Sequence, residues 1–214
     1  MKDFRLYCVG ESGNCFKVAL MLELCGYKWQ PVFVDFFGGA TRGGAYRDEV
    51  NELGEVPVLE FDGKRLTQSG AILTYLARLS GKYGGRGEDQ ELEVLRWILF
   101  DNHKFTSYFA TLRWMVGLQK TGDPAVIDFL QKRVLSTFSI VDKHLANRPF
   151  LIGNEPTIAD FSLVGYQYYE EETGIDRNAF PNLKAWRERI ASLPGWKHPY
   201  ELMPRGMKEE AVTG

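Results

Sequence analysis

The chain has 214 residues, which is enough for one large domain or two small ones with a sizeable core. Its 26 basic and 28 acidic side chains nearly balance, which argues against a nucleic-acid partner because phosphate binding requires a basic excess. The three cysteines predict no disulfide framework, and no apolar run is long enough to cross a bilayer, so we expect a cytoplasmic protein with no membrane partner.

The start of the chain predicts a strand–helix–strand unit. Aromatic and β-branched residues favour strands at 4–9 and 29–34. Between them, apolar residues at helical spacing predict a helix that begins near Ser12 and ends at Gly26. A glycine-rich passage at 36–46 follows and is too irregular for either element. Two strands joined through a helix favour a parallel pair.

The next segment predicts a hairpin and a second helix. Extended runs at 56–61 and 64–67 are joined by Asp62-Gly63, a strong hairpin signal. A helix opened by Ser69 then runs to residue 79. Because the hairpin adds antiparallel strands to the parallel pair, we expect an α/β domain with a mixed sheet.

The composition then changes and predicts a second domain that is entirely helical. Residues 81–88 are polar and glycine-rich, which is typical of a linker. We therefore expect an α/β domain at 1–80 and an all-α domain at 89–214. Its helical patterns lie at 90–118, at 124–145, at 157–172 behind a capping box formed by Thr157 and Asp160, and at 182–193.

Ser12 and Cys15 lie one turn apart at the mouth of the first helix. A helix N-terminus presents unpaired N–H groups, which would stabilise a thiolate there and can lower a cysteine pKa from about 8.5 to about 3.5. The Ser12 hydroxyl does not ionise, but it could donate a hydrogen bond to the thiolate of a ligand. Ser12 as a simple helix cap is the competing interpretation, and the local sequence does not decide between them.

Two further positions allow a structural and a functional interpretation. Val56-Pro57 precedes the hairpin, where the proline could be an ordinary trans edge residue or part of a special turn with a cis bond. Gln68-Ser69 precedes the second helix, where Ser69 could be only a cap or could mark a site for a ligand carboxylate.

Taken in order, these pieces resemble one family. The Ser-x-x-Cys helix mouth, then NELGEVPVLE and then QSGAILTYL look like the thioredoxin-like half of a cytosolic glutathione S-transferase. FLIGNEPTIADFS resembles the family's capping-box segment, and FPNLKAWRERI followed by PGW resembles its last helix. The resemblance covers residues 4–200 and is to a bacterial, serine-type member. It implies the glutathione transferase fold.

The resemblance also implies a catalytic role for Ser12. The matching residue in the family hydrogen-bonds the sulfur of glutathione, and a serine there implies thiolate stabilisation rather than a mixed disulfide. Asn14 lies close enough in the sequence to assist. Cys15 would then be a packed residue, unless it faces the ligand and supports thiol–disulfide exchange.

The remaining glutathione contacts are carried over in the same way. The backbone of Val56, before a cis Pro57, would pair with the cysteinyl part, and Gln68 with Ser69 would hold the γ-glutamyl group. Gln68 stands where many members carry glutamate, so the γ-glutamyl ammonium loses one charge partner. For the glycyl carboxylate we expect Arg42, with Arg47 in reserve.

The resemblance places the electrophile against the helical domain. The candidates for its pocket are His103, Tyr108, Arg113 and Trp114. The competing interpretation is that this aromatic stripe packs in the helical core or a dimer interface, with His103 a buried structural residue.

The function implied is activation of the glutathione thiolate for attack on small hydrophobic electrophiles, a detoxification reaction, by a cytoplasmic homodimer that needs glutathione as co-substrate and no metal. A glutathione-dependent reductase, dehalogenase or isomerase on the same fold is the first alternative. A non-catalytic member that binds ligands or proteins is the second, although Ser12 favours an enzyme.

Overall fold

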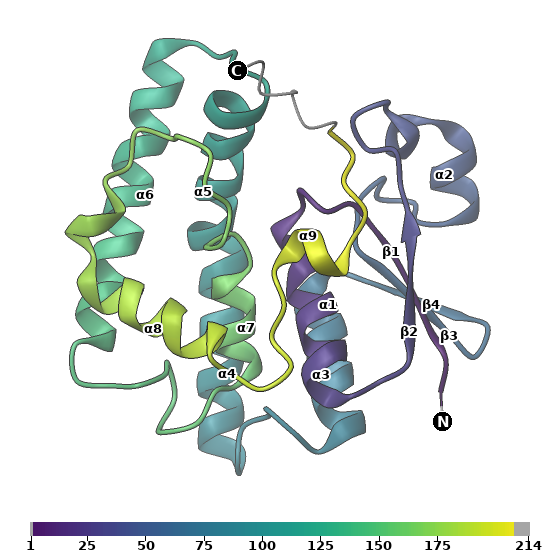
Figure 1. Cartoon of the computed structure of the whole chain (residues 1–214), viewed down its shortest axis with the longest axis horizontal. Helices are drawn as coiled ribbons and strands as arrows, with labels where there is room; N and C mark the ends of the chain where they lie inside the picture. Colours follow the sequence, from purple (N-terminus) through teal and green to yellow (C-terminus); the bar gives the residue numbers. More distant parts are fainter. Residues whose placement is uncertain (1, 208–214) are drawn as a thin grey trace.

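The computed structural model describes residues 2–207, and its first part is an α/β unit built on a four-stranded sheet (Figure 1). The strands lie in the order β2-β1-β3-β4, and α1 and α3 pack against each other beside them. Figure 1 shows α2 on the side of the strands away from α1. The elements are β1 Phe4–Cys8, α1 Gly13–Cys25, β2 Trp29–Phe33, α2 Gly44–Glu49, β3 Val58–Phe61, β4 Lys64–Thr67 and α3 Ser69–Ser80.

The sheet is mixed, as the sequence predicts. β1 pairs in parallel with β2 and antiparallel with β3, which pairs antiparallel with β4. Asp62 and Gly63 between β3 and β4 both have positive φ angles, 49° and 69°. A two-residue hairpin turn of this kind requires positive φ at both positions, and aspartate followed by glycine tolerates it best.

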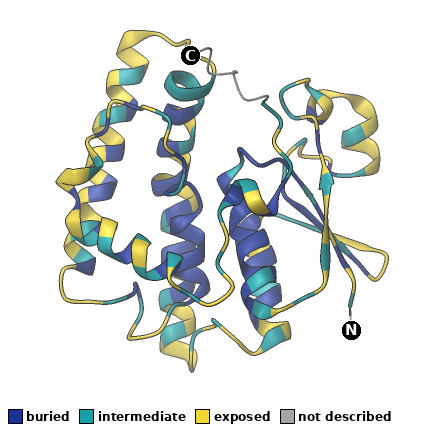
Figure 2. Ribbon diagram, viewed as in Figure 1, coloured by how far each residue is buried: buried dark blue, intermediate teal, exposed yellow. Residues whose placement is uncertain are grey.

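The centre of the fold is α1. It is apolar on almost every side, and most of its residues are buried (Figure 2). A helix of this composition must be covered all round. α1 packs against α3 on one side and against α7 and α9 of the helical part on the other. The N-terminus of α1, where Ser12 lies, is therefore held by both halves of the molecule.

The second part is helical, with no strand between residues 81 and 207. The single helix expected over 90–118 is close to continuous but contains two π-helical turns, Asp101–Phe105 and Arg113–Leu118. π-turns insert an extra residue and often lie at functional sites. The helices are α4 Glu88–Phe100, α5 Thr106–Leu112, α6 Pro124–Leu145, α7 Ile158–Val164, α8 Pro181–Ala191 and α9 Pro199–Leu202.

Two expectations about this part are corrected. α7 ends at Val164 instead of continuing to residue 172, because residues 165–168 form turns, the first of which, Gly165, lies directly against α1. A side chain on Gly165 would meet the Gly13 carbonyl oxygen at 2.7 Å. The short α9 has no counterpart in the sequence prediction, since four residues carry too little periodicity to detect.

The capping box of α7 is present and does more than cap a helix. The Asp160 carboxylate accepts hydrogen bonds from the backbone N–H groups of Thr157 at 2.8 Å and Leu151 at 2.9 Å. It also accepts one from Trp186 Nε1 of α8 at 2.8 Å. Asp160 is fully buried. This carboxylate therefore joins α7, the preceding loop and α8, a structural role in line with the sequence analysis.

A buried ion pair joins the two halves. Lys17 Nζ of α1 lies 2.7 Å from Asp101 Oδ2 at the end of α4, and both side chains are 0% exposed. Lys17 Nζ also donates to Thr106 Oγ1 at 3.3 Å, while Ser162 Oγ of α7 donates to Asp101 at 2.6 Å. A buried ion pair is tolerated only when such further hydrogen bonds satisfy both charges.

Within residues 2–207, no helix has both the length and the apolar character needed to span a membrane.

Asp101→Ala should lower the free energy of unfolding by about 3 to 5 kcal/mol, because it leaves the Lys17 ammonium buried without a countercharge. Urea denaturation followed by circular dichroism measures this. Asp128→Ala is the matched control, since its pair with Lys132 on α6 is exposed and contributes less than about 1 kcal/mol. Equal losses in the two variants would contradict this role for the ion pair.

Candidate functional site

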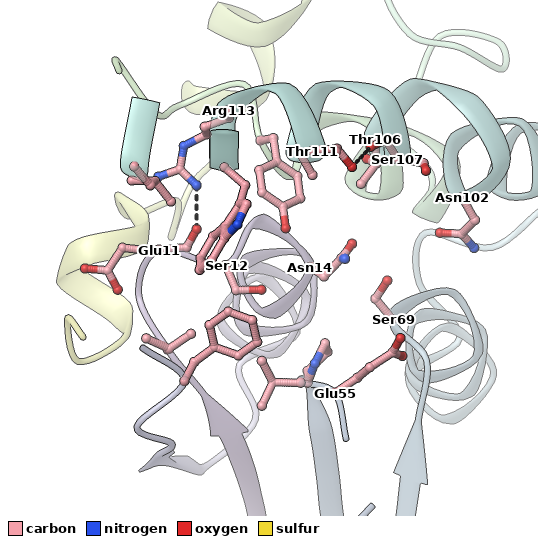
Figure 3. A pocket seen from close by; sticks show the side chains of 18 of the residues that line it. Glu11, Ser12, Asn14, Glu55, Ser69, Asn102, Thr106, Ser107, Thr111 and Arg113 are labelled. Carbon is pink, nitrogen blue, oxygen red and sulfur yellow. Dashed lines mark hydrogen bonds between the residues drawn. The ribbon is translucent and has the colours of Figure 1, made fainter. Parts of the chain in front are cut away.

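A cavity of about 500 Å³ lies between the α/β part and the helices (Figure 3). One wall comes from the loop between β1 and α1, from Val56-Pro57 and from the start of α3. The other comes from the first π-turn, α5 and the second π-turn. In Figure 3, Ser12, Asn14 and Ser69 face the same space, with Asn102 and Ser107 on the opposite side. Its volume is in the range that binds small molecules.

Ser12 is the N-cap of α1 and lines this cavity. Its Oγ accepts a hydrogen bond from the Cys15 backbone N–H at 3.3 Å. Accepting this bond uses a lone pair and leaves the hydroxyl hydrogen free to be donated into the cavity. The side-chain oxygen of neighbouring Asn14, which lines the same cavity, is buried with no hydrogen-bond partner among the described residues.

Cys15, one turn after Ser12, does not line the cavity. Its side chain is 0% exposed and belongs to the hydrophobic core. Burial raises the pKa of the Cys15 thiol to about 12. A neutral, enclosed thiol of this kind is neither a nucleophile nor a ready partner in disulfide exchange.

The rest of the α/β wall is formed by the residues just before β3 and by those at the start of α3. The Val56–Pro57 peptide bond is cis, and both residues line the cavity. Ser69 is the first residue of α3, so the unpaired N–H groups of that helix end lie at the cavity. Gln68 before it has a φ of 67°, and its Nε2 donates to Glu55 Oε2 at 2.9 Å.

Arg113 lines the cavity, but other groups occupy its guanidinium. Nη1 donates to the Glu11 carbonyl at 2.7 Å, while Nε and Nη2 bind both oxygens of Glu171 at 2.8 and 2.5 Å. The guanidinium also lies 4.0 Å from the ring centroid of Tyr169. Arg113 therefore holds the loop before Ser12 against the helical part.

An aromatic cluster connects the two walls of the cavity. Trp114 stacks on Phe37 with ring centroids 5.7 Å apart and an interplanar angle of 16°. It meets Phe36 edge-on, also at 5.7 Å. Phe36 and Phe37 belong to the glycine-rich passage between β2 and α2, where the sequence indicated only an irregular segment. All three side chains line the cavity and give it an apolar region.

Four of the residues that the sequence analysis proposed as contacts of glutathione or the electrophile lie outside the lining of the cavity. Arg42 and Arg47 are exposed, and Arg47 Nη1 donates to the Glu52 carbonyl at 3.3 Å. His103 is exposed, not buried, because the first π-turn directs Asp101 and Phe105 inward and residues 102–104 outward. Tyr108 misses the cavity because α5 presents Ser107, Ala110 and Thr111 to it, a set three or four residues apart.

The sequence analysis did not identify several of the lining residues, because few of them belong to a sequence pattern that indicates a site. Ser107 and Thr111 share a helix face, but this face becomes informative only once the cavity is located. Glu55 belongs to the motif NELGEVPVLE, and Tyr166 follows the motif FLIGNEPTIADFS, but the sequence analysis gave neither residue a role. The added polar and aromatic residues are Glu11, Phe36, Phe37, Asn51, Glu55, Asn102, Thr106, Ser107, Thr111 and Tyr166. Within the described range, no group of three or more His, Cys, Asp or Glu side chains is arranged to hold a metal ion.

Together, the mixed four-stranded sheet, the cis-proline before β3 and the attached helical part define a glutathione-transferase fold. Family models described as "Glutathione S-transferase, N-terminal domain" and "Glutathione S-transferase, C-terminal domain" match residues 2–78 and 105–194.

Individual proteins agree with these models. The chain is 32% identical to a maleylacetoacetate isomerase of Rhizobium meliloti, over 93% of this chain and 97% of that one. It is 30% identical to human glutathione S-transferase A3, over 89% and 84%. A solved glutathione S-transferase from Pseudomonas fluorescens superimposes with a TM-score of 0.85 at 31% identity, covering 92% of this chain and 98% of that one. This chain belongs to the glutathione S-transferase family.

The cysteines provide a test of the site geometry. In the native protein at pH 8, iodoacetamide should modify half-buried Cys25 and leave Cys8 and Cys15 unmodified, because burial keeps both as neutral thiols. Peptide mapping by mass spectrometry measures this, and all three should react in urea. Modification of Cys15 as fast as Cys25 would show that its thiol reaches the cavity.

Proposed function

We propose that this protein is a serine-type, glutathione-conjugating enzyme that activates the thiol of glutathione and transfers it to small hydrophobic electrophiles, a detoxification reaction in the cytoplasm. One observation carries the proposal: the Ser12 hydroxyl lies at the N-terminus of α1, in a cavity that also contains Val56-Pro57 and the N-terminus of α3. The cavity is polar at this end and apolar at Trp114.

The chemistry required of Ser12 is modest. A free thiol has a pKa of about 8.5 and is mostly protonated at pH 7. Lowering that pKa by two units requires about 2.7 kcal/mol of preferential stabilisation of the thiolate. One hydrogen bond to an ionised group and the positive end of a helix dipole can together supply a stabilisation free energy of this size. The thiol proton leaves to solvent, the sulfur attacks the electrophile, and the leaving group departs with its electron pair.

We propose that Asn14 assists Ser12 as a second hydrogen-bond donor to the thiolate.

The rest of glutathione is proposed to lie across the α/β wall. The backbone of Val56 pairs with the cysteinyl unit, and the N–H groups at Ser69 receive the γ-glutamyl carboxylate. For the glycyl carboxylate we retain Arg42, with Arg47 as second choice. Arg42 is exposed and comes shortly after the cavity-lining residues Phe36 and Phe37 in the sequence.

Glu55 offers the countercharge that glutamine at position 68 cannot. Its carboxylate is held 2.9 Å from Gln68 Nε2 and lines the cavity. The other acidic residue of the lining, Glu11, accepts hydrogen bonds from the backbone N–H groups of Gly206 and Met207 at 2.8 and 3.0 Å. We therefore assign the γ-glutamyl ammonium to the pair formed by Glu55 and Gln68.

The proposed active form is a homodimer of chains divided into domains at 1–80 and 89–214. Three leucines of α4, Leu92, Leu95 and Leu99, are 57%, 50% and 59% exposed. They recur three and four residues apart, so they form one apolar stripe on the helix. A stripe of this kind supports an interface with a second copy.

Isomerisation is the second candidate, because the Rhizobium meliloti relative carries that name. It would use the same thiolate, which adds to the substrate and is then released, so glutathione is not consumed. A panel of aryl halides, epoxides and cis-alkene diacids, assayed for loss of free thiol, distinguishes the two reactions.

Ser12→Ala should lower kcat/KM for conjugation of an aryl halide by about 10- to 100-fold, since the bound thiol loses its hydrogen-bond donor. The glutathione Kd, measured by calorimetry, should change by less than about threefold. Cys15→Ser is the matched control and should retain activity. A damaging Cys15→Ser change beside a harmless Ser12→Ala would contradict the serine-type mechanism, and absence of millimolar glutathione binding would overturn the site.

Glu55→Gln should raise the glutathione Kd by about tenfold, because a hydrogen bond between two charged groups is lost. The same variant should bind a glutathione analogue that lacks the γ-glutamyl amino group as the unmodified protein does. Calorimetry with both ligands measures the difference. An equal loss of affinity for both ligands would remove Glu55 from the ammonium site.

A further inference from the structure

The chain returns to the candidate site after its last helix. Residues 203–207, which we call the C-terminal strap, follow α9 and pass the loop between β1 and α1 (Figure 1). The Gly10 N–H of that loop donates to the Pro204 carbonyl at 2.7 Å. A side chain added at Gly10 would lie 3.1 Å from the same carbonyl oxygen, so glycine favours this close approach. The strap therefore lies against the residues that lead into Ser12.

Glu11 binds the strap with both oxygens of its carboxylate. Oε2 accepts a hydrogen bond from the Gly206 backbone N–H at 2.8 Å, and Oε1 accepts one from Met207 at 3.0 Å. The side chain of Glu11 is buried, and Arg205 Nε lies 3.7 Å from Oε1. Hydrogen bonds to an ionised acceptor are roughly twice as strong as neutral ones. A glutamine could not replace this carboxylate, because one of its two terminal groups is a donor.

The strap supports the apolar end of the cavity from outside. A side chain added at Gly206 would lie 2.7 Å from Phe37 Cδ2 and 2.8 Å from Val9 Cγ2. Phe37 and Val9 line the cavity, whereas none of the residues 203–207 does. The Phe37 ring in turn stacks on Trp114 of the helical wall. The strap is therefore a second layer, in contact with lining residues that form the apolar end.

The loop before Ser12 has separate attachments to the helical part. The Tyr169 hydroxyl donates to the Gly10 carbonyl at 2.7 Å, and Arg113 Nη1 donates to the Glu11 carbonyl at 2.7 Å. These bonds use the backbone of the loop and not the carboxylate of Glu11. Loss of the carboxylate should therefore release the strap at 206–207 and leave Ser12 in place.

We propose that Glu11 is a positioning residue for electrophile specificity: its carboxylate fastens the strap against Phe37, and the strap keeps the Phe37 ring stacked on Trp114. The inference rests on the proposed function and concerns the electrophile, not glutathione. With the strap released, the Phe37 ring can move away from Trp114, so the apolar end becomes wider. A small electrophile then loses contacts on binding, while a bulky one is admitted more easily.

The test is steady-state kinetics of Glu11→Gln with two aryl halides, one with a single ring and one with two fused rings. The KM for the single-ring halide should rise about five- to tenfold, with kcat changed less than about twofold, because ground-state contacts are lost. The ratio of kcat/KM for the fused-ring halide to that for the single-ring halide should rise about tenfold. The glutathione Kd and the bound-thiol pKa should stay as in the unmodified protein.

Glu23→Gln is the matched control. Its carboxylate also holds two groups, Trp29 Nε1 at 2.7 Å and Lys197 Nζ at 2.9 Å, and it also joins α1 to the chain near α9. Glu23 does not line the cavity. This variant should leave both the KM values and the ratio unchanged, so it separates a general loss of stability from a change at the apolar end.

Gly206→Ala tests the same contact without touching the carboxylate. It keeps every hydrogen-bonding group and adds a methyl group against Phe37 and Val9, so it should raise the ratio in the same direction as Glu11→Gln. An unchanged ratio in both variants would overturn the inference, as would a loss of glutathione affinity that matches the loss for the electrophile. Failure of the unmodified protein to conjugate glutathione to either halide would instead refute the proposed function.

Discussion

The buried ion pair between Lys17 and Asp101 is the interaction on which the site depends. α1 presents its N-terminus to the cavity, and the first π-turn supplies the opposite wall, so their separation must be fixed to well under one side-chain length. Two paired charges that are 0% exposed, with Thr106 and Ser162 as further partners, provide that constraint. Leaving either charge buried without its partner would raise the free energy of the folded state, so the pair opposes separation of the two halves. The helix that is held in this way has Ser12 as its N-cap.

Much of the fold could be predicted because its signals are local. The hairpin follows from Asp62-Gly63, α1 from its apolar periodicity, and α6 from a cap residue followed by proline. Ser12, Pro57 and Ser69 each lie at the boundary of an element, where the local sequence left a structural and a functional interpretation open, and the family resemblance pointed to the functional one. All three line the cavity. The competing interpretations of Ser12 and Cys15 were separated by burial, which a sequence does not display: Cys15 is enclosed, whereas Ser12 faces the cavity.

The helical wall could not be predicted, for two physical reasons. A π-turn changes which residues face inward, so the exposed position of His103 and the inward position of Asp101 do not follow from an α-helical period. The other contacts join residues far apart in the chain. Phe37 meets Trp114, and Tyr166 meets Gly13, only because the sheet and the helices are packed together. Glu55 was missed for a related reason, since its carboxylate matters only through its hydrogen bond to Gln68.

The proposed function requires the α1 N-terminus and Ser12 to lower the pKa of the glutathione thiol. Titration of the thiol of glutathione in its complex with the unmodified protein, followed by thiolate absorbance and compared with free glutathione, tests this directly. We expect a midpoint about two pH units below that of the free thiol, corresponding to about 2.7 kcal/mol. A bound thiol that titrates at the same pH as free glutathione would contradict it.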